Sequence, residues 1–215
     1  MATTAETNAP RSGRDFGEAF LPEDDVVMVA RRLAADVGLT PISPSTGATL
    51  SMLAAATSAR AAIEIGTGTG VGALWLLRGM RTDGVLTTID IDAEHQRVAR
   101  RIFAEAGYAA SRTRVITGQA LDVLPRLADG AYDLLVLDGD RSDYAACVGE
   151  APRLLRPGGV LALNGALAGG RIADTAMRDP QTVALRNLVR SFRDNDDWRP
   201  ALLPVGDGLL CAVRV

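Results

Sequence analysis

The feature that most constrains the fold is an apolar segment that runs into a cluster of glycines. Residues 61–65 read Ala-Ala-Ile-Glu-Ile, and glycine then occupies every second position over residues 66–70. A second apolar segment, residues 85–89, ends in Asp90. Glycine lets the backbone approach a ligand closely, and the N-terminus of a following helix offers free N–H donors. The pattern is typical of an adenosine-binding strand, turn and helix, in which Asp90 accepts hydrogen bonds from the ribose hydroxyls.

The spacing of these glycines argues against a dinucleotide. A pyrophosphate-binding turn has the spacing G-x-G-x-x-G, which requires glycine at position 71, where this chain has Val71. Glu64 lies two residues before the first glycine, and its carboxylate suits a cationic ligand better than an anionic one. S-adenosylmethionine carries both a sulfonium and an ammonium group. We therefore expect this cofactor, and an NAD(P)-dependent oxidoreductase is the less favoured alternative.

Composition places the chain among single-domain proteins of the cytoplasm. Its 215 residues are 47% hydrophobic and 23% charged, as in one soluble globular domain. The net charge of −3 provides no basic surface for nucleic acid, and no apolar segment is long enough to span a membrane. No secretory signal is evident, and the two cysteines have no metal or redox spacing. We expect a mobile tail over residues 1–20 and one domain over residues 21–215.

Hydrophobic periodicity alternates between strand-like and helix-like segments. The predicted strands are residues 61–65, 85–90, 113–117, 132–137 and 160–163, followed by a hairpin of 201–205 and 209–213. The predicted helices are residues 23–37, 48–56, 70–78, 93–106, 121–128, 144–155 and 181–194. This order predicts an α/β fold, a Rossmann-like, doubly wound sheet of seven strands that is mostly parallel and has an antiparallel last strand.

Polar and small residues lie at the ends of the predicted strands. They are Glu64, Asp90, the segment 118–120, Asp138 and Asn164. Ligands of such sheets bind beyond the carboxyl ends of the strands. We therefore expect these residues to lie together on one rim and to form the binding site.

From Ile42 to the C-terminus the sequence resembles the cation-dependent O-methyltransferases typified by the catechol and caffeoyl-coenzyme A enzymes. The motifs that carry the resemblance are Ile42 to Gly47, Glu64 to Gly70, Thr88-Ile89-Asp90, Asp133 to Tyr144, Leu155 to Gly159 and Gly206-Asp207-Gly208. The resemblance implies an S-adenosylmethionine-dependent O-methyltransferase that acts on a small hydroxylated molecule, such as a phenol.

Site residues can be carried over from the family by position. The cofactor-binding positions are Ile42, Glu64, Gly66, Thr67, Gly68, Gly70, Gly72, Asp90, Gln119, Ala120 and Asp138. The resemblance places Asp138 at the reaction centre too, with Arg141 and Tyr144 as further catalytic candidates. A tyrosine on an amphipathic helix is also a common core residue, so the structural alternative stays open for Tyr144. We expect His95 on the surface.

The sequence departs from the family at the metal site. The family needs three oxygen ligands; Asp138 matches one, but Asn164 and Gly165 replace an Asp-Asn pair. Because Mg²⁺ prefers anionic oxygen, we predict that no metal is bound, with Asp140 pointing elsewhere. Arg141 replaces the family's lysine base and cannot take a proton, although it could hold an anionic substrate or simply lie exposed. These losses leave open a non-catalytic homologue that binds the cofactor and serves as a regulatory or scaffold subunit.

The helix predicted from Asp25 to Val37 bears on assembly. Its apolar residues cover more of the circumference than one core-facing stripe requires. Relatives of this kind pair through helices that flank the sheet. We therefore expect a homodimer with twofold symmetry.

Overall fold

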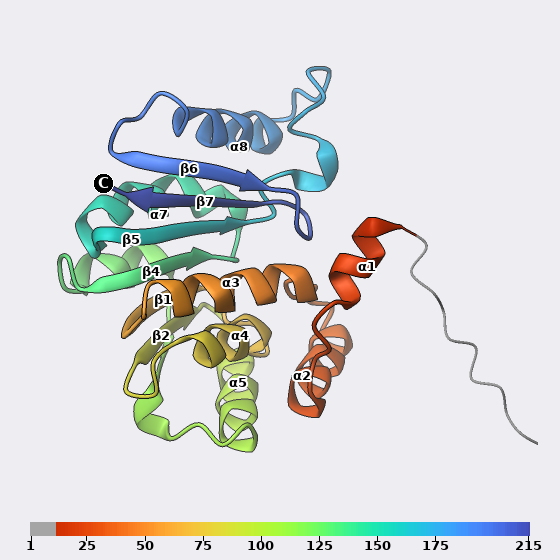
Figure 1. Cartoon of the computed structure of the whole chain (residues 1–215), viewed down its shortest axis with the longest axis vertical. Coiled ribbons are helices and arrows are strands. Elements are labelled where there is room, and N and C mark those ends of the chain that lie inside the picture. The colour runs from red at the N-terminus through yellow and green to blue at the C-terminus, as the bar shows by residue number, and fades with distance from the viewer. Residues whose placement is uncertain (1–11) are drawn as a thin grey trace, which may run out of the picture.

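Seven strands form one sheet through the centre of the protein (Figure 1). The structure is a computed structural model that describes residues 12–215. The strands are β1 (Ala61–Ile65), β2 (Val85–Asp90), β3 (Thr113–Thr117), β4 (Tyr132–Leu137), β5 (Leu155–Asn164), β6 (Trp198–Leu203) and β7 (Leu209–Arg214). Their order across the sheet is β3-β2-β1-β4-β5-β7-β6, and only β7 runs antiparallel to its neighbours. This confirms the predicted doubly wound sheet with an antiparallel last strand.

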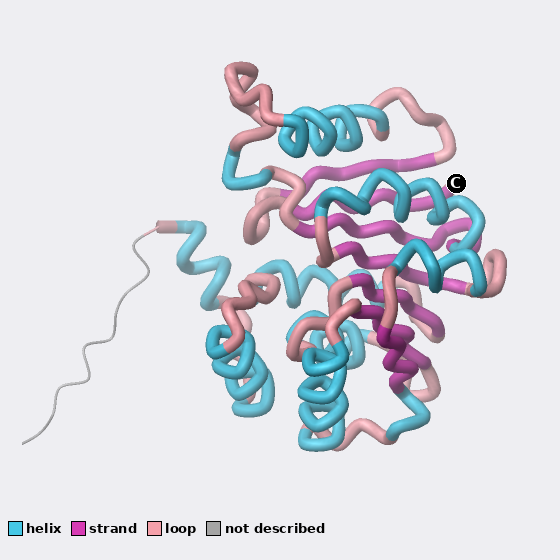
Figure 2. The backbone as a smooth tube through the Cα atoms, turned by 180° about the vertical axis from the view of Figure 1, so that it is seen from behind, coloured by secondary structure: helices cyan, strands magenta, loops and turns pink. Residues whose placement is uncertain are grey.

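Helices cover both faces of the sheet and enclose a separate core on each. The helices are α1 (Gly13–Ala19), α2 (Asp25–Asp36), α3 (Pro44–Ala56), α4 (Val71–Gly79), α5 (Ala93–Glu105), α6 (Ala120–Val123), α7 (Tyr144–Leu154) and α8 (Pro180–Ser191). Helices α2 to α5 pack on one face, and α6 to α8 pack on the other, which Figure 2 shows from behind. Strand β4 is buried along its whole length because Leu134 and Val136 enter one core while Leu135 and Leu137 enter the other.

A buried carboxylate fixes the register of β1 against β4. Asp133, at the start of β4, accepts hydrogen bonds from the backbone N–H groups of residues 60 and 61 at 2.7 and 2.9 Å. It also pairs with Arg156 at 2.6 Å. From this anchor the two strands run in parallel until Ile65 lies opposite Leu137. The loops that follow the two strands therefore leave the sheet side by side.

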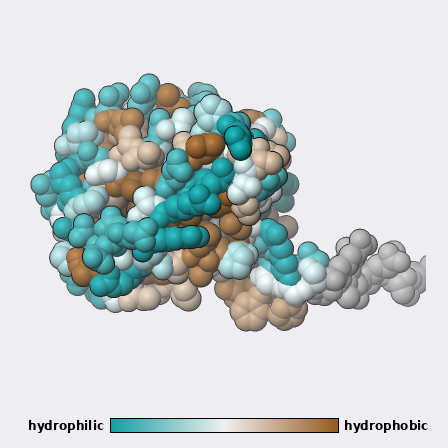
Figure 3. Space-filling view, turned by 90° about the horizontal axis from the view of Figure 1, so that it is seen from above, coloured by the Kyte–Doolittle hydropathy of each residue, from teal (hydrophilic) through white to brown (hydrophobic). Residues whose placement is uncertain are grey.

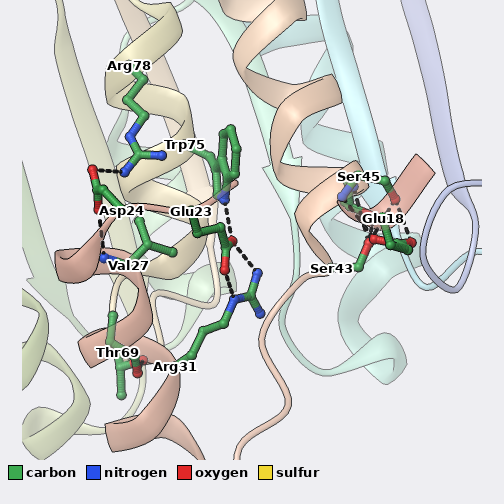
Figure 4. Close-up of polar contacts among 12 residues, drawn as sticks. Glu18, Glu23, Asp24, Val27, Arg31, Ser43, Ser45, Thr69, Trp75 and Arg78 are labelled. Carbon is green, nitrogen blue, oxygen red and sulfur yellow. Dashed lines mark hydrogen bonds and ion pairs between the residues drawn. The ribbon is translucent and has the colours of Figure 1, made fainter. Parts of the chain in front are cut away.

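Part of the predicted tail forms a helix. Residues 1–11 lie outside the described residues, and from Gly13 to Ala19 the chain forms α1. The Glu18 carboxylate accepts hydrogen bonds from the backbone N–H and the hydroxyl of Ser45 at 3.0 and 2.7 Å (Figure 4). Helix α1 buries none of its residues, so polar contacts of this kind attach it. Such contacts leave no periodic signal in the sequence.

Several boundaries also differ from those predicted: β6 spans Trp198–Leu203 rather than 201–205, and α6 ends at Val123, where a 3₁₀ turn replaces the rest of the predicted helix 121–128. Helix α3 begins at Pro44 rather than Ala48, because the Ser43 hydroxyl caps the N–H of Thr46 at 3.2 Å and proline is favoured in a first helical turn. Strand β5 begins at Leu155 rather than Val160, and its register against β4 shifts where the Pro-Gly-Gly segment passes.

The surface seen from above is mainly hydrophilic, with apolar residues scattered between polar ones (Figure 3). Over residues 12–215, no helix combines the length and the apolar character that crossing a membrane requires.

Candidate active site

A large cavity lies at the carboxyl ends of β1, β2 and β4. Its volume is about 620 Å³, within the range that small-molecule sites occupy. The turn after β1, the acid that ends β2, the segment 118–120 after β3 and the segment 138–140 after β4 all line it. The structure thus brings most of the predicted rim together around one cavity.

The floor of this cavity is a contact between two backbones. Gly66 has a φ of +94°, and a Cβ atom there would lie 2.5 Å from the carbonyl oxygen of Asp138. The Asp138 N–H donates to the carbonyl of Ile65 at 2.8 Å. Only glycine permits this approach. The contact lies between β1 and β4, where the strand order of a doubly wound sheet reverses and ligands bind.

Asp90 is held in the cavity wall by hydrogen bonds from its surroundings. One carboxylate oxygen accepts from the N–H of Gly68 at 2.8 Å, and the other accepts from the N–H of Asp92 at 2.9 Å. Each oxygen keeps a lone pair for a ligand. His95 lines the same wall, with Nδ1 3.6 Å from Asp90, and its side chain is only 20% exposed. The expectation of a surface histidine is therefore wrong, because α5 begins at Ala93 and its first turn places His95 beside Asp90.

Glu64 lies behind the cavity wall rather than in it. Its side chain is buried, and Thr88 donates a hydrogen bond to it at 2.6 Å. Burial raises the pKa of Glu64 to about 8, and the charges of Asp138 and Asp90 add to the effect, whereas the bond from Thr88 opposes it. A Cβ atom at Gly72 would collide with the Glu64 carboxyl. The carboxyl therefore fills the space beside Gly72.

The remaining predicted cofactor positions divide between the wall and the core. Gly66, Thr67, Gly68, Gly72, Gln119 and Ala120 line the cavity, as Asp90 and Asp138 do. Gly70 caps α4 and faces the ring of Phe103 instead, at a distance that leaves no room for a side chain. Ile42 is buried in the core beside Gly72 and lines a second cavity.

The second cavity, of about 550 Å³, adjoins the first. Both cavities share Thr40, Pro41, Asp138 and Gly139 in their walls. Helix α1, the turn after β6 and the end of β5 complete the second cavity. A molecule in each cavity would therefore meet its neighbour at Asp138.

Asp138 is partly buried and lies between the two cavities. Burial raises its pKa to about 7, against the opposing effects of a hydrogen bond from Asn164 and of the positive charge of Arg141. The Asn164 amide donates to it at 2.6 Å. Near neutral pH this carboxyl therefore exists in both protonated and ionised forms.

Arg141 occupies the space that a side chain at position 165 would fill. Gly165 has a φ of +68°, and a Cβ atom there would collide with the guanidinium of Arg141. Arg141 begins a short 3₁₀ helix, η3 (Arg141–Asp143), and donates to a carboxylate oxygen of Asp207 at 2.9 Å. The other oxygen of Asp207 accepts from the N–H of Gly169 at 2.6 Å. Arg141 thus lies at the cavity and links the end of β5 to the β6–β7 turn.

The donor set does not fit a divalent cation. The described residues contain no group of three metal-ligating His, Cys, Asp or Glu side chains. Asp140 accepts from the N–H of Ser142 at 2.9 Å and caps η3, as expected, rather than joining Asp138. The amide of Asn164 is engaged with Asp138, and the cationic guanidinium of Arg141 fills the space beside Gly165.

Tyr144 is buried, and its hydroxyl contacts the backbone, which is not what we expect of a catalytic residue. Its side chain is buried, and its hydroxyl donates to the carbonyls of Leu137 at 3.0 Å and Asn164 at 3.2 Å. Burial raises its pKa far above the usual range, with a further contribution from Asp138. The hydroxyl therefore joins the ends of β4 and β5, next to Asp138.

Sequence reasoning assigned no role to several residues of the second cavity. They are Arg14, Glu18 and Asp207. The first two belong to a segment without periodicity, so nothing pointed to them. Asp207 did lie in a quoted motif, Gly206-Asp207-Gly208, but its ion pair with Arg141 joins segments far apart in the chain.

Comparison with known proteins agrees with this geometry. The family model of the O-methyltransferases matches residues 25–215. A Mycobacteroides abscessus protein that carries an O-methyltransferase name without an assigned acceptor is 47% identical over 214 residues, which span 100% of both chains.

Solved structures agree as well. The O-methyltransferase TomG from Streptomyces achromogenes, which is involved in tomaymycin synthesis and was crystallised with S-adenosylmethionine, is 27% identical, with a TM-score of 0.84 over 93% of this chain and 94% of TomG. An O-methyltransferase from Bacillus cereus in complex with S-adenosylhomocysteine is 26% identical, with a TM-score of 0.83 over 93% and 95% of the two chains. These matches leave no support for a nicotinamide oxidoreductase. The chain therefore belongs to the S-adenosylmethionine-dependent O-methyltransferase family.

Proposed function

We propose that this protein methylates a hydroxyl oxygen of a small molecule, such as a phenol, and that it does so without a divalent cation. The cofactor would occupy the cavity behind Gly66, and the acceptor would occupy the second cavity. The observation that carries this proposal is the meeting of the two cavities at one buried carboxyl, Asp138.

The residues of the first cavity fit S-adenosylmethionine. Asp90 can accept from the ribose hydroxyls, and the segment 118–120 can frame the adenine. Asp138 would face the ammonium of the methionine portion, which passes over the glycine turn at Gly66. The buried carboxyl of Glu64, which lies behind the cavity wall, adds negative potential whenever it is ionised. When bound, the cofactor supplies a methyl group that its sulfonium already activates.

The contribution of the protein would then be alignment and exclusion of water. In-line displacement depends on holding the two reactants at near-attack distance. Reaction of an anionic oxygen with a cation reduces charge, so the buried surroundings of Asp138 favour the reaction. Tyr144 would act as a positioning residue, because its hydroxyl fixes the ends of the strands that carry Asp138 and Asn164.

Two further expectations concern location and assembly. Cys147 and Cys211 are both free and buried, which suits a reducing compartment such as the cytoplasm. Helix α2 is attached to α4 through Glu23, which accepts from Trp75 at 3.0 Å and from Arg31 (Figure 4). Its outer side still exposes Met28 at 47%. We propose that this side pairs with a second copy of the chain.

The cofactor assignment predicts that Asp90→Ala weakens binding of S-adenosylhomocysteine. Loss of hydrogen bonds to a charged carboxylate costs about 1.5–3 kcal/mol, so the Kd should rise about 10- to 100-fold. Isothermal calorimetry measures this, with Glu94→Ala as the matched control, because that exposed carboxylate contacts only Arg97. An unchanged Kd in Asp90→Ala would place the cofactor elsewhere.

The metal assignment predicts that methyl transfer persists in chelator. Labelled S-adenosylmethionine is incubated with the protein and a panel of phenolic and catecholic acceptors, with and without EDTA. Equal transfer under both conditions is expected, because Gly165 supplies no ligand and Arg141 fills the space. Loss of transfer in EDTA with recovery in Mg²⁺ would show that Asn164 or Asp140 is a ligand after all. Transfer to any acceptor also eliminates a purely regulatory or scaffold role.

The assembly proposal predicts a sedimentation mass near twice the chain mass of 22.6 kDa at micromolar concentration. Met28→Glu should shift the protein toward the monomer, because a charge would be buried on the outer side of α2. A wild-type mass equal to that of one chain at all concentrations would instead leave α2 as ordinary core packing.

A further inference from the structure

Two guanidinium groups face the second cavity. Arg14 reaches it from α1, where its guanidinium donates to the carbonyl of Gly206. Arg141 reaches it from η3 and contacts the next residue of the same turn, Asp207. The charged and titratable groups around the cavity are Arg14, Glu18, Asp138, Arg141, Tyr144 and Asp207.

The carboxylates in this set are already engaged with the protein. Glu18 accepts from Ser45 and from the N–H of Gly206 at 3.3 Å. Asp207 uses one oxygen for Arg141 and the other for the N–H of Gly169. Among residues 12–215, Arg14 makes no ion pair at all. The cavity therefore holds charges of both signs, and Arg14 brings to it a guanidinium that is not ion-paired within the described part of the chain.

The guanidinium of Arg141 is held in a fixed position at the cavity. The guanidinium fills the side-chain space above Gly165, and Asp207 holds it there at 2.9 Å. Asp138, in the wall of both cavities, lies close enough for Arg141 to lower its pKa against the effect of burial. A cation is thus built into the acceptor side of the point where the two cavities meet. A guanidinium presents N–H donors in a rigid plane, which suits an anionic oxygen.

On the basis of the function proposed above, we propose that Arg141, assisted by Arg14, selects acceptors whose hydroxyl is acidic and binds as an oxyanion. The proton of the hydroxyl leaves to solvent as the oxyanion pairs with the guanidinium. A lone pair of the oxygen then forms the new O–C bond to the methyl group. The C–S bond breaks, its electron pair stays on sulfur, and a neutral ether and a neutral thioether result.

The class of acceptor follows from what a guanidinium can and cannot do. It cannot accept a proton, so it cannot deprotonate a weakly acidic alcohol. An adjacent positive charge lowers the pKa of an ionisable group by about one to three units. Phenols and enols that already ionise near neutral pH are therefore the acceptors that this cavity suits, and simple alcohols are not.

The test uses 4-nitrophenol as the probe, because its ionised form absorbs visible light and reports its own pKa. The protein is first saturated with S-adenosylhomocysteine, so that no turnover occurs. In the wild type, the pKa of the bound probe should fall by about one to three units. Arg141→Gln should abolish this shift. Arg97→Gln is the matched control, since Arg97 is also an exposed arginine in an ion pair but lies on α5.

A second variant separates a role in anion binding from a purely structural one. Asp207→Asn removes the counter-charge of Arg141 while retaining the shape of the side chain. If Arg141 binds the oxyanion, Asp207→Asn should bind the probe as tightly as the wild type or more tightly. If Arg141 only links β5 to the β6–β7 turn, both variants should weaken binding alike, and the proposal is wrong.

The outcomes also separate this inference from the proposed function. Failure of the wild type to bind S-adenosylhomocysteine would contradict the proposed function itself. The protein can also bind S-adenosylhomocysteine normally while the probe shows no saturable binding, no pKa shift, or the same shift in Arg141→Gln. Each of these results would contradict only the role of Arg141.

Discussion

The close backbone contact between the β1 and β4 loops is the constraint on which the site depends. Gly66 lies against the Asp138 carbonyl, and no residue with a side chain could do so. Asp133 sets the register that makes the two loops meet, five residues before Asp138. Both cavities open on either side of Asp138, so the placement of cofactor and acceptor follows from one strand pair.

Burial of carboxyl groups beside this contact explains why a cationic ligand suits it. Asp138 and Glu64 both have raised pKa values, of about 7 and about 8, because desolvation penalises their charged forms. A ligand that brings positive charge offsets that penalty, which neutral or anionic ligands do not. On the acceptor side the chain itself supplies a cation, Arg141, which fills the space beside Gly165. Its positive charge opposes the effect of burial on the pKa of Asp138.

Patterns within short segments of the sequence predicted much of the sheet and of the first cavity. Apolar segments of strand length located β1 to β4, and the alternate glycines with Asp90 located the first cavity. What sequence could not show were contacts between distant segments. Helix α1 is attached through Glu18, and His95 reaches the cavity wall beside Asp90 from the first turn of α5. The placement of Arg141 above Gly165 likewise depends on Asp207, a residue from the other end of the chain.

Proton release on cofactor binding tests the central claim most directly. A cationic amino group beside Asp138 favours the ionised carboxyl, so its pKa of about 7 should fall and the proton bound near pH 7 should leave. Calorimetry of S-adenosylhomocysteine binding in buffers with different heats of ionisation should therefore show net proton release, reduced in Asp138→Asn, and an affinity that increases from pH 6 to pH 8. Identical heats in all buffers, or proton uptake, would contradict the account.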